Sequence, residues 1–183
     1  NIVIPAKSKY YDTKHSYCNH FVGKRKYFSK EGAKMGNVIG IVAEYNPFHN
    51  GHARLIEQTR AQLGAVCPVV CVMSGDFVQR GSPAVYSKFA RAEAAVRCGA
   101  DLVLELPTPW AMASAESFAR GAVGLLAATG VVDVLSFGSE TGELAPLRAA
   151  AAALDGPDYP ERLRAGLARG LSFPAARQAA ESC

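Results

Sequence analysis

The most informative stretch of the sequence is Val-Ile-Gly-Ile-Val-Ala-Glu-Tyr-Asn-Pro-Phe-His-Asn-Gly-His, residues 38–52. Its first six residues are a continuous apolar run, which is typical of a central parallel strand that is covered on both faces. The polar turn that follows reaches Asn50, a residue type that caps helices well. We expect this helix to run to about Leu63 and to stop at Gly64, because glycine readily adopts the conformations that end helices. The stretch therefore predicts a strand, a loop and a helix.

The same alternation recurs along the chain. Further short apolar runs are separated by helical stretches that begin at a serine and end before a glycine. Repeated strand–helix units of this kind predict an α/β fold, a Rossmann-like parallel sheet with helices on both faces. The expected strands are 38–43, 68–73, 101–106 and 132–137, and the expected helices are 50–63, 87–98 and 115–128.

The pattern changes after the fourth expected strand. Two alanine-rich stretches, near Leu144–Leu154 and Asp158–Ala168, predict helices, and the chain reaches Cys183 within what resembles another helix. No compact ending is visible there, so we expect a fragment of a longer protein. We therefore divide the chain into a leader, an ATP-binding domain and the start of a helical region, over residues 1–34, 35–143 and 144–183.

The leader differs in composition from the rest of the chain. It holds seven lysines and one arginine against two acids, whereas the remainder holds one lysine, eleven arginines and fourteen acids. Met35 stands at this break. We interpret Met35 as the natural start and residues 1–34 as a non-native or disordered leader. The alternative is a basic arm that binds nucleic acid, for which residues 24–27, Lys-Arg-Lys-Tyr, are suitable.

The composition indicates neither a membrane protein nor a metal site. No apolar run approaches the roughly 18–20 residues of a membrane helix, and no secretory signal follows the basic start, so we expect a cytoplasmic location. Cys67 and Cys71 lie in an apolar stretch that is typical of a strand, where four residues span about 13 Å, too far for one disulfide or one zinc ion. His15, Cys18 and His20 lack a fourth ligand.

Polar segments that contain glycine or proline follow the predicted strands. The carboxyl ends of parallel strands meet at one edge of a sheet, and ligands of such sheets bind there. We therefore expect the functional site at this shared edge. The segments are 44–51, 74–86, 107–114 and 138–142.

The first of these segments contains His49-Asn50-Gly51-His52, the H-x-G-H arrangement of nucleotidyltransferases and class I tRNA synthetases. A helix N-terminus offers unpaired N–H groups to phosphate. The two imidazoles add donors for the α- and β-phosphate oxygens, and Gly51 lets the nucleotide lie close to the backbone. We predict that His49 and His52 are catalytic, because such donors stabilise the charge that develops as pyrophosphate leaves. The alternative is two unrelated histidines, one a cap and one on the surface.

The loop after the second predicted strand offers further polar side chains. Asp76, Gln79 and Arg80 are candidates to contact substrate, metal-bound phosphate or tRNA, because long loops at the active edge tend to be functional. Lys88 and Arg91, on the next helix, fit a solvated face and a phosphate contact equally well.

Two other features have a simpler alternative. Gly138, after the fourth predicted strand, would let the backbone approach a ligand closely, although an ordinary turn explains it too. Ser114 and Glu116 are interpreted as a helix cap with an acid in the first turn, a structural role.

Five runs of the chain, in order and with matching spacing, resemble the bacterial tRNA(Met) cytidine acetate ligase family. Four are Val-Met-Ser-Gly-Asp-Phe-Val-Gln-Arg-Gly (72–81), Gly-Ala-Asp-Leu-Val-Leu-Glu-Leu-Pro (99–107), Ser-Ala-Glu-Ser-Phe-Ala (114–119) and Leu-Ser-Phe-Gly-Ser-Glu (135–140). The fifth is the run 40–52 that contains the two histidines. The resemblance extends from Met35 to the end of the chain and does not include the leader.

This resemblance implies a reaction. The family uses ATP to activate acetate as acetyl-adenylate, and then acetylates the wobble cytidine of elongator tRNA(Met) to N4-acetylcytidine. Mg²⁺ is expected with the ATP, without dedicated protein ligands. Two further nucleotide-binding positions of the family, and most of its tRNA-binding surface, lie beyond Cys183. The resemblance maps ATP binding onto Val42, Ala43, Glu44, Tyr45, Asn46, Pro47, Phe48, His49, Asn50, Gly51, His52, Ala53, Arg54, Leu55 and Gly138.

Two other functions remain open at this point. The same loop serves adenylyltransferases of small metabolites, such as a nicotinamide or pantetheine phosphate. A nucleotide-binding fragment without turnover is the third reading, because the family is about twice as long as this chain.

Overall fold

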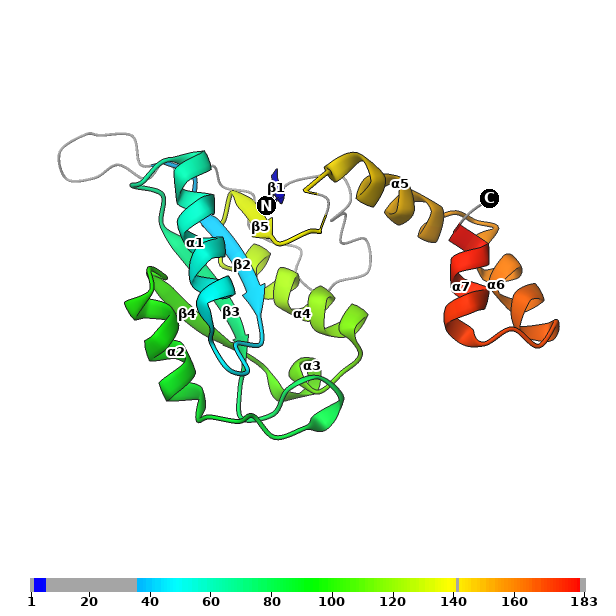
Figure 1. Ribbon diagram of the computed structural model, residues 1–183, viewed down its shortest axis with the longest axis horizontal. Helices are drawn as coiled ribbons and strands as arrows, with labels where there is room; N and C mark the ends of the chain where they lie inside the picture. Colours follow the sequence, from blue (N-terminus) through cyan, green and yellow to red (C-terminus); the bar gives the residue numbers. More distant parts are fainter. Residues whose placement is uncertain (1, 6–35, 141, 182–183) are drawn as a thin grey trace. The chain divides into compact units, whose positions relative to one another are not determined.

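In the computed structural model, residues 2–5, 36–140 and 142–181 are described (Figure 1). The chain divides into two compact units, residues 1–138 and 139–183. The sequence predicted the division after residue 143, and the structure divides the chain after residue 138. The first unit holds the sheet and the second unit is helical.

Four parallel strands form the sheet of the first unit, as predicted. They follow the spatial order β5-β2-β3-β4, with β1 added beside β5. In register, Ile39 of β2 lies opposite Val69 of β3 and Val134 of β5. The bounds are β2 (Ile39–Ala43), β3 (Val69–Ser74), β4 (Leu102–Leu106) and β5 (Val134–Phe137).

Strand β1 (Ile2–Pro5) lies within the segment 1–34 that the sequence suggested to be a non-native or disordered leader. It pairs antiparallel with β5, with Ile2 opposite Phe137 and Pro5 opposite Val134. Without it β5 would be an edge strand with unpaired backbone groups, and a short β-branched run such as Ile-Val-Ile suits such an edge. The proposed basic arm at residues 24–27, and the cysteine and histidines of residues 15–20, lie outside the described residues.

Helices cover both faces of the sheet, again as predicted (Figure 1). On one face, alternate residues of β3 such as Cys71 and Met73 pack with Ile56 and Ala95 of two helices. On the other face, Val70 and Val72 belong to a cluster with α4. The first pair of helices is α1 (Asn50–Leu63) and α2 (Lys88–Arg97), and the second is α3 (Thr108–Ala111) and α4 (Ala115–Ala128).

Local signals set most helix ends. Ser87 and Ser114 cap α2 and α4 through their side-chain oxygens, and Gly64 caps the end of α1. The short helix α3 lies within the segment 107–114, which the sequence had suggested only as a polar loop.

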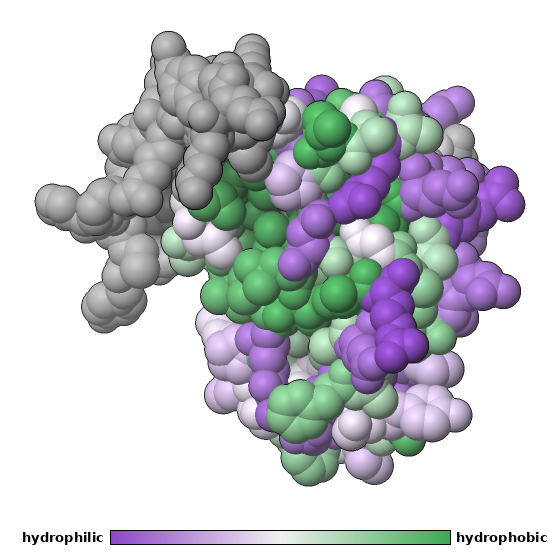
Figure 2. Space-filling view, turned by 90° about the vertical axis from the view of Figure 1, so that its left-hand side faces the viewer, coloured by the Kyte–Doolittle hydropathy of each residue, from purple (hydrophilic) through white to green (hydrophobic). Residues whose placement is uncertain are grey.

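Figure 2 shows an apolar area among hydrophilic side chains on the side of the molecule that faces left in Figure 1. Helix α2 and the outer strand β4 lie on this side of the ribbon. Exposed large apolar side chains of these two elements are Phe89, Val96 and Leu102.

The second unit contains α5 (Leu144–Leu154), α6 (Tyr159–Ala168) and α7 (Phe173–Glu181). Helices α6 and α7 pack closely, because a Cβ at Gly166 would lie only 3.0 Å from the Cβ of Ala176. None of the helices in the described parts of the chain is long and apolar enough to cross a membrane.

Candidate functional site

A pocket opens at the carboxyl end of β2, the central strand of the parallel sheet. The chain leaves β2 through α1 toward β3 and reaches β5, on the other side of β2, only after α4. Such a reversal of strand order separates the loops and makes a crevice for ligands. The volume of about 430 Å³ suits a small molecule. The lining residues are Val42, Ala43, Glu44, Tyr45, Asn46, Pro47, His49, His52, Leu55, Gln79 and Phe118.

The two histidines cap the helix that begins at this pocket. The backbone N–H of Gly51 donates to His49 Nδ1 over 3.1 Å, and the N–H of His49 donates to His52 Nδ1 over 3.2 Å. The cap is therefore His49, and Asn50 is the first helical residue, which corrects the prediction that Asn50 is the cap. An imidazole nitrogen serves here in place of the usual side-chain oxygen.

These capping bonds fix the proton of each ring. A nitrogen that accepts a hydrogen bond carries no hydrogen, so in the neutral rings the hydrogen lies on Nε2. Burial, and next the neighbouring His49, lower the pKa of His52, which favours its neutral form. The rings stack with centroids 3.7 Å apart and planes 23° from parallel. The pair thus presents two Nε2–H donors at the N-terminus of α1.

Gly51 is required by one of these rings. A Cβ at Gly51 would lie 2.9 Å from Cε1 and 3.0 Å from Nδ1 of His49. The glycine therefore makes room for the imidazole, in addition to the close nucleotide approach that the sequence suggested.

Two aromatic rings pack against His52. The buried Tyr45 ring meets His52 edge-on, with centroids 4.9 Å apart, and Phe48 lies 4.9 Å from Tyr45. The Tyr45 hydroxyl donates to Cys71 Sγ of β3 over 3.2 Å. Burial raises the pKa of the Tyr45 hydroxyl, and it raises the pKa of the Cys71 thiol to about 11, so both groups stay protonated. Sequence reasoning included Tyr45 in the site but did not foresee this anchoring role.

A second loop, after β3, is bonded to the first. The Glu44 carboxylate accepts from the N–H of Gln79 over 2.8 Å, and the Asn46 side chain accepts from the N–H of Val85 over 2.7 Å. Of the three candidates in this loop, Gln79 lines the pocket, whereas Asp76 and Arg80 are exposed and do not.

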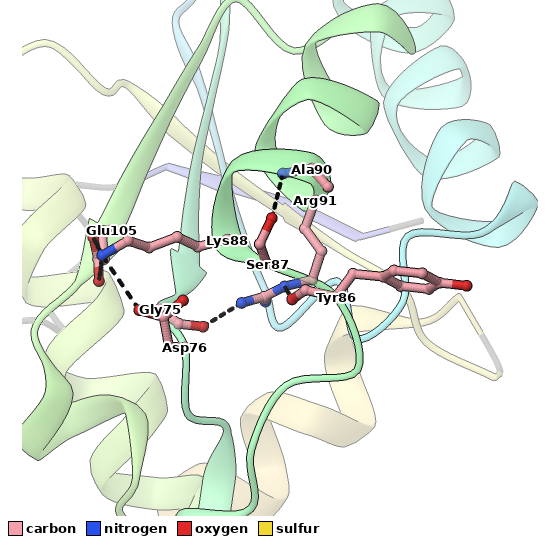
Figure 3. Close-up of polar contacts among 8 residues, drawn as sticks. All are labelled: Gly75, Asp76, Tyr86, Ser87, Lys88, Ala90, Arg91 and Glu105. Carbon is pink, nitrogen blue, oxygen red and sulfur yellow. Dashed lines mark hydrogen bonds and ion pairs between the residues drawn. The ribbon is translucent and has the colours of Figure 1, made fainter.

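Arg91 has a structural role rather than a phosphate contact (Figure 3). Its side chain is buried, with 2% of the residue exposed. It donates to the backbone carbonyls of Glu44 over 2.7 Å and Tyr86 over 3.0 Å, and to that of Gly75. One guanidinium thus connects the loops that follow β2 and β3 to the segment before α2.

Lys88 lies between two carboxylates, which with it form what we call the Lys88 cluster: Asp76, Lys88 and Glu105 (Figure 3). Its ammonium donates to Glu105 Oε1 and Oε2 over 3.0 and 2.9 Å, and Asp76 Oδ2 lies 3.6 Å away. The hydrogen bond to Glu105 is the main cause of the raised pKa of Lys88. Lys88 is therefore paired with carboxylates, which makes a phosphate contact unfavourable.

The remaining predicted ATP-binding residues do not line this pocket. Gly138 directly follows β5, and a Cβ there would meet nothing within 4 Å. Asn50, Ala53 and Arg54 line a separate hollow of about 580 Å³ along α1. Sequence reasoning missed Phe118 of α4, which lines the pocket and was visible only as part of the run 114–119. Within the described residues, no three His, Cys, Asp or Glu side chains gather as a metal site.

Comparison with known proteins agrees with this geometry. The family model described as HIGH Nucleotidyl Transferase matches residues 36–182. A "tRNA(Met) cytidine acetate ligase" of Acetivibrio thermocellus is 50% identical over 145 residues, which cover 78% of this chain and 35% of the relative. The one from Syntrophomonas wolfei is 51% identical, with the same coverage. The chain thus spans about a third of the length of these curated relatives.

Solved structures show the same fold. The crystal structure of Thermotoga maritima TmcAL bound with alpha-thio ATP superposes with a TM-score of 0.70 at 48% identity, over 79% of this chain and 35% of that one. The apo form gives a TM-score of 0.71 at the same identity. Because the family model matches most of the chain, from residue 36 to residue 182, the chain belongs to the HIGH nucleotidyl transferase family.

Proposed function

We propose that the pocket at the end of β2 binds ATP, with the Nε2–H groups of His49 and His52 donating to its phosphate oxygens. The observation that carries this proposal is the pair of stacked histidines that caps the N-terminus of α1. A helix N-terminus with added neutral donors suits a triphosphate. The solved relative whose title names alpha-thio ATP supports the choice of nucleotide.

The chemistry we propose is the activation of acetate. A carboxylate oxygen of acetate attacks the α-phosphorus, the bond to the bridging oxygen breaks, and pyrophosphate leaves, which yields acetyl-adenylate. Negative charge grows on the phosphate oxygens in the transition state, where preorganised donors lower the barrier by roughly 3–4 kcal/mol for each well-placed group. Mg²⁺ is expected to arrive on the phosphates, since it is commonly held by substrate phosphates and water.

The second half-reaction we propose is acetyl transfer to RNA. The N4 amine of the wobble cytidine of elongator tRNA(Met) attacks the acetyl carbonyl, AMP leaves, and the amine loses a proton. The names of the relatives support this acceptor. Residues 35–183 hold twelve basic and fourteen acidic side chains. Because tRNA needs a clustered positive surface, we infer that most tRNA affinity resides outside this segment. A tRNA substrate accords with the expected cytoplasmic location.

Exchange of labelled pyrophosphate into ATP by the complete protein tests the proposal. We expect exchange that depends on acetate. Exchange that depends instead on nicotinamide mononucleotide or phosphopantetheine would identify an adenylyltransferase of small metabolites. ATP binding by calorimetry with no exchange under any condition would identify a nucleotide-binding protein without turnover.

A further inference from the structure

The Lys88 cluster lies at the same edge of the sheet as the nucleotide pocket. In the register of β3 and β4, Met73 pairs with Glu105 and Ser74 with Leu106, so the Glu105 side chain belongs near the carboxyl end of β4. Asp76 follows the end of β3 closely. The loop that carries Asp76 is bonded to Glu44 of the pocket through Gln79. ATP binding and acetate activation leave this neighbouring cluster without a role.

The charge of the cluster favours a neutral ligand over an anion. One ammonium faces two carboxylates, and the side chains of Asp76, Lys88 and Glu105 are 59%, 27% and 43% exposed. These exposed charges sum to minus one, and the buried Arg91, which interacts with Asp76 and Glu105, directs its N–H groups to backbone carbonyls rather than to a ligand. A neutral polar group that has a hydrogen-bond donor beside an acceptor matches the cluster better.

The cluster still has hydrogen-bonding capacity for such a group. Two N–H groups of Lys88 go to Glu105, while Asp76 Oδ2, at 3.6 Å, is beyond hydrogen-bonding distance. An ammonium has three N–H groups, and the third faces Asp76 only across this longer ion pair, so an acceptor on a ligand beside Asp76 can take it. The Asp76 carboxylate beside it is an acceptor. The pair thus offers one acceptor and one donor a few ångströms apart.

An exposed aromatic ring adjoins this pair. Phe89 is 78% exposed although it directly follows Lys88, whose Nζ lies 5.7 Å from the centre of the ring. Unpaired bases of RNA stack on rings of this kind, and their Watson–Crick edges then bind neighbouring polar side chains.

We propose that the Lys88 cluster and Phe89 bind the cytosine that accepts the acetyl group. Asp76 accepts from the exocyclic N4 amine, Lys88 donates to the adjacent ring acceptor N3, and Phe89 stacks on the base. Carboxylates are established acceptors for cytosine N4. Uracil places a carbonyl oxygen where cytosine has its amine, so the Asp76 carboxylate repels it. The inference rests on the proposed function, because that function supplies a cytidine as the acceptor.

The test compares Asp76→Asn with the wild type in the complete protein. An amide has the same shape but can donate as well as accept, so it should no longer distinguish the two pyrimidines. The probes are two anticodon stem-loop RNAs that differ only by cytidine or uridine at the wobble position. Competition binding measures the cytidine preference, acetyl transfer measures the reaction, and acetate-dependent pyrophosphate exchange measures the first half-reaction. Glu93→Gln is the matched control for loss of one negative charge. Glu93 is an exposed residue of α2, the helix that carries Lys88.

We expect Asp76→Asn to lower the preference for the cytidine RNA, and acetyl transfer, by about tenfold or more, and to spare pyrophosphate exchange. Phe89→Ala should weaken the binding of both RNAs equally, since stacking does not depend on the base. An unchanged cytidine preference in Asp76→Asn, or an equal loss of exchange and transfer, overturns the inference. Wild-type protein without acetate-dependent exchange instead overturns the proposed function, and the binding competition still decides whether the cluster selects cytosine.

Discussion

The Arg91 guanidinium donates a hydrogen bond of 2.7 Å to the backbone carbonyl of Glu44, the residue that directly follows β2. This bond joins α2 to the loop that leads to His49 and His52. The same carbonyl also accepts a longer bond of 3.3 Å from the Ser74 hydroxyl of β3. The position of this loop therefore depends on a buried charge that comes from a different segment of the chain.

Replacing this arginine should destabilise the fold. Arg91→Met removes a charged donor from three backbone carbonyls, of which that of Glu44 keeps only the longer bond from Ser74. Hydrogen bonds to charged groups are worth about 1.5–3 kcal/mol each. We expect the free energy of unfolding to fall by about 3 kcal/mol or more, as measured by urea denaturation. Arg97→Met is the control, because Arg97 is 77% exposed and its ion pair with Glu93 is a surface pair, so its loss should cost under about 0.5 kcal/mol. A loss below about 1 kcal/mol for Arg91→Met would contradict the connecting role.

The two histidines can be tested with a variant that separates capping from donation. His49→Asn retains a good helix cap but removes the Nε2–H donor, whereas His49→Ala removes both. We expect each variant to slow pyrophosphate exchange about a hundredfold or more, and His52→Ala to do the same. His49→Asn should retain the stability that His49→Ala loses, about 1 kcal/mol. ATP affinity, from calorimetry, should fall less than the rate because the helix N-terminus remains. Near-normal exchange in His49→Asn would show that His49 is only a cap.

Gly51→Ala should impair the reaction without impairing the fold. The added methyl would lie 2.9 Å from the His49 ring and must displace it, while alanine is intrinsically better than glycine in a helix by about 1 kcal/mol. We expect at least a tenfold loss of exchange with an unfolding free energy unchanged within about 1 kcal/mol. The control is Gly124→Ala in α4, where a Cβ meets nothing within 4 Å. Full activity in Gly51→Ala would show that the ring has other room.

The stability of the domain should decrease in mild acid because of His52. Its pKa is lowered from the usual 6.5, mainly by burial and then by His49. The unfolded chain therefore takes up the proton at a higher pH than the folded chain. This contribution is complete above pH 6.5 and is lost as the pH falls through 6.5 toward the lowered pKa of the folded state. Urea denaturation from about pH 8 to pH 5 should show a decline that His52→Asn lacks. A constant difference between the two proteins over this range would refute the assignment.

The sequence predicted the elements whose signals are local. Continuous apolar runs located the four parallel strands, and Ser87, Ser114 and Gly64 marked helix ends correctly because caps act over only a few residues. Strand β1 was not foreseen, since pairing with β5 depends on a partner more than a hundred residues away. Helix α3 is a single short turn with no period to detect.

The loop of the candidate site was located from the sequence, but its hydrogen bonds and packing were not. The H-x-G-H spacing correctly located the loop, but the sequence assigned the cap to Asn50 because amide side chains are common caps and imidazoles are not. The role of Arg91 was undetermined, because a helical surface pattern does not show which long side chain turns inward. Phe118 lines the pocket from a helix on the other face of the sheet, and only the fold brings it there.

The hydrogen bonds at the start of α1 have a consequence for metal binding. A histidine that binds zinc donates its second ring N–H to a carbonyl or carboxylate, whereas His49 and His52 accept from backbone N–H groups at Nδ1. Their Nε2 atoms consequently hold hydrogens and have no lone pair for a metal ion. Zinc would have to shift the proton of each ring and break both capping bonds before binding there. The helix cap thereby disfavours the capture of a transition metal by these two neighbouring histidines.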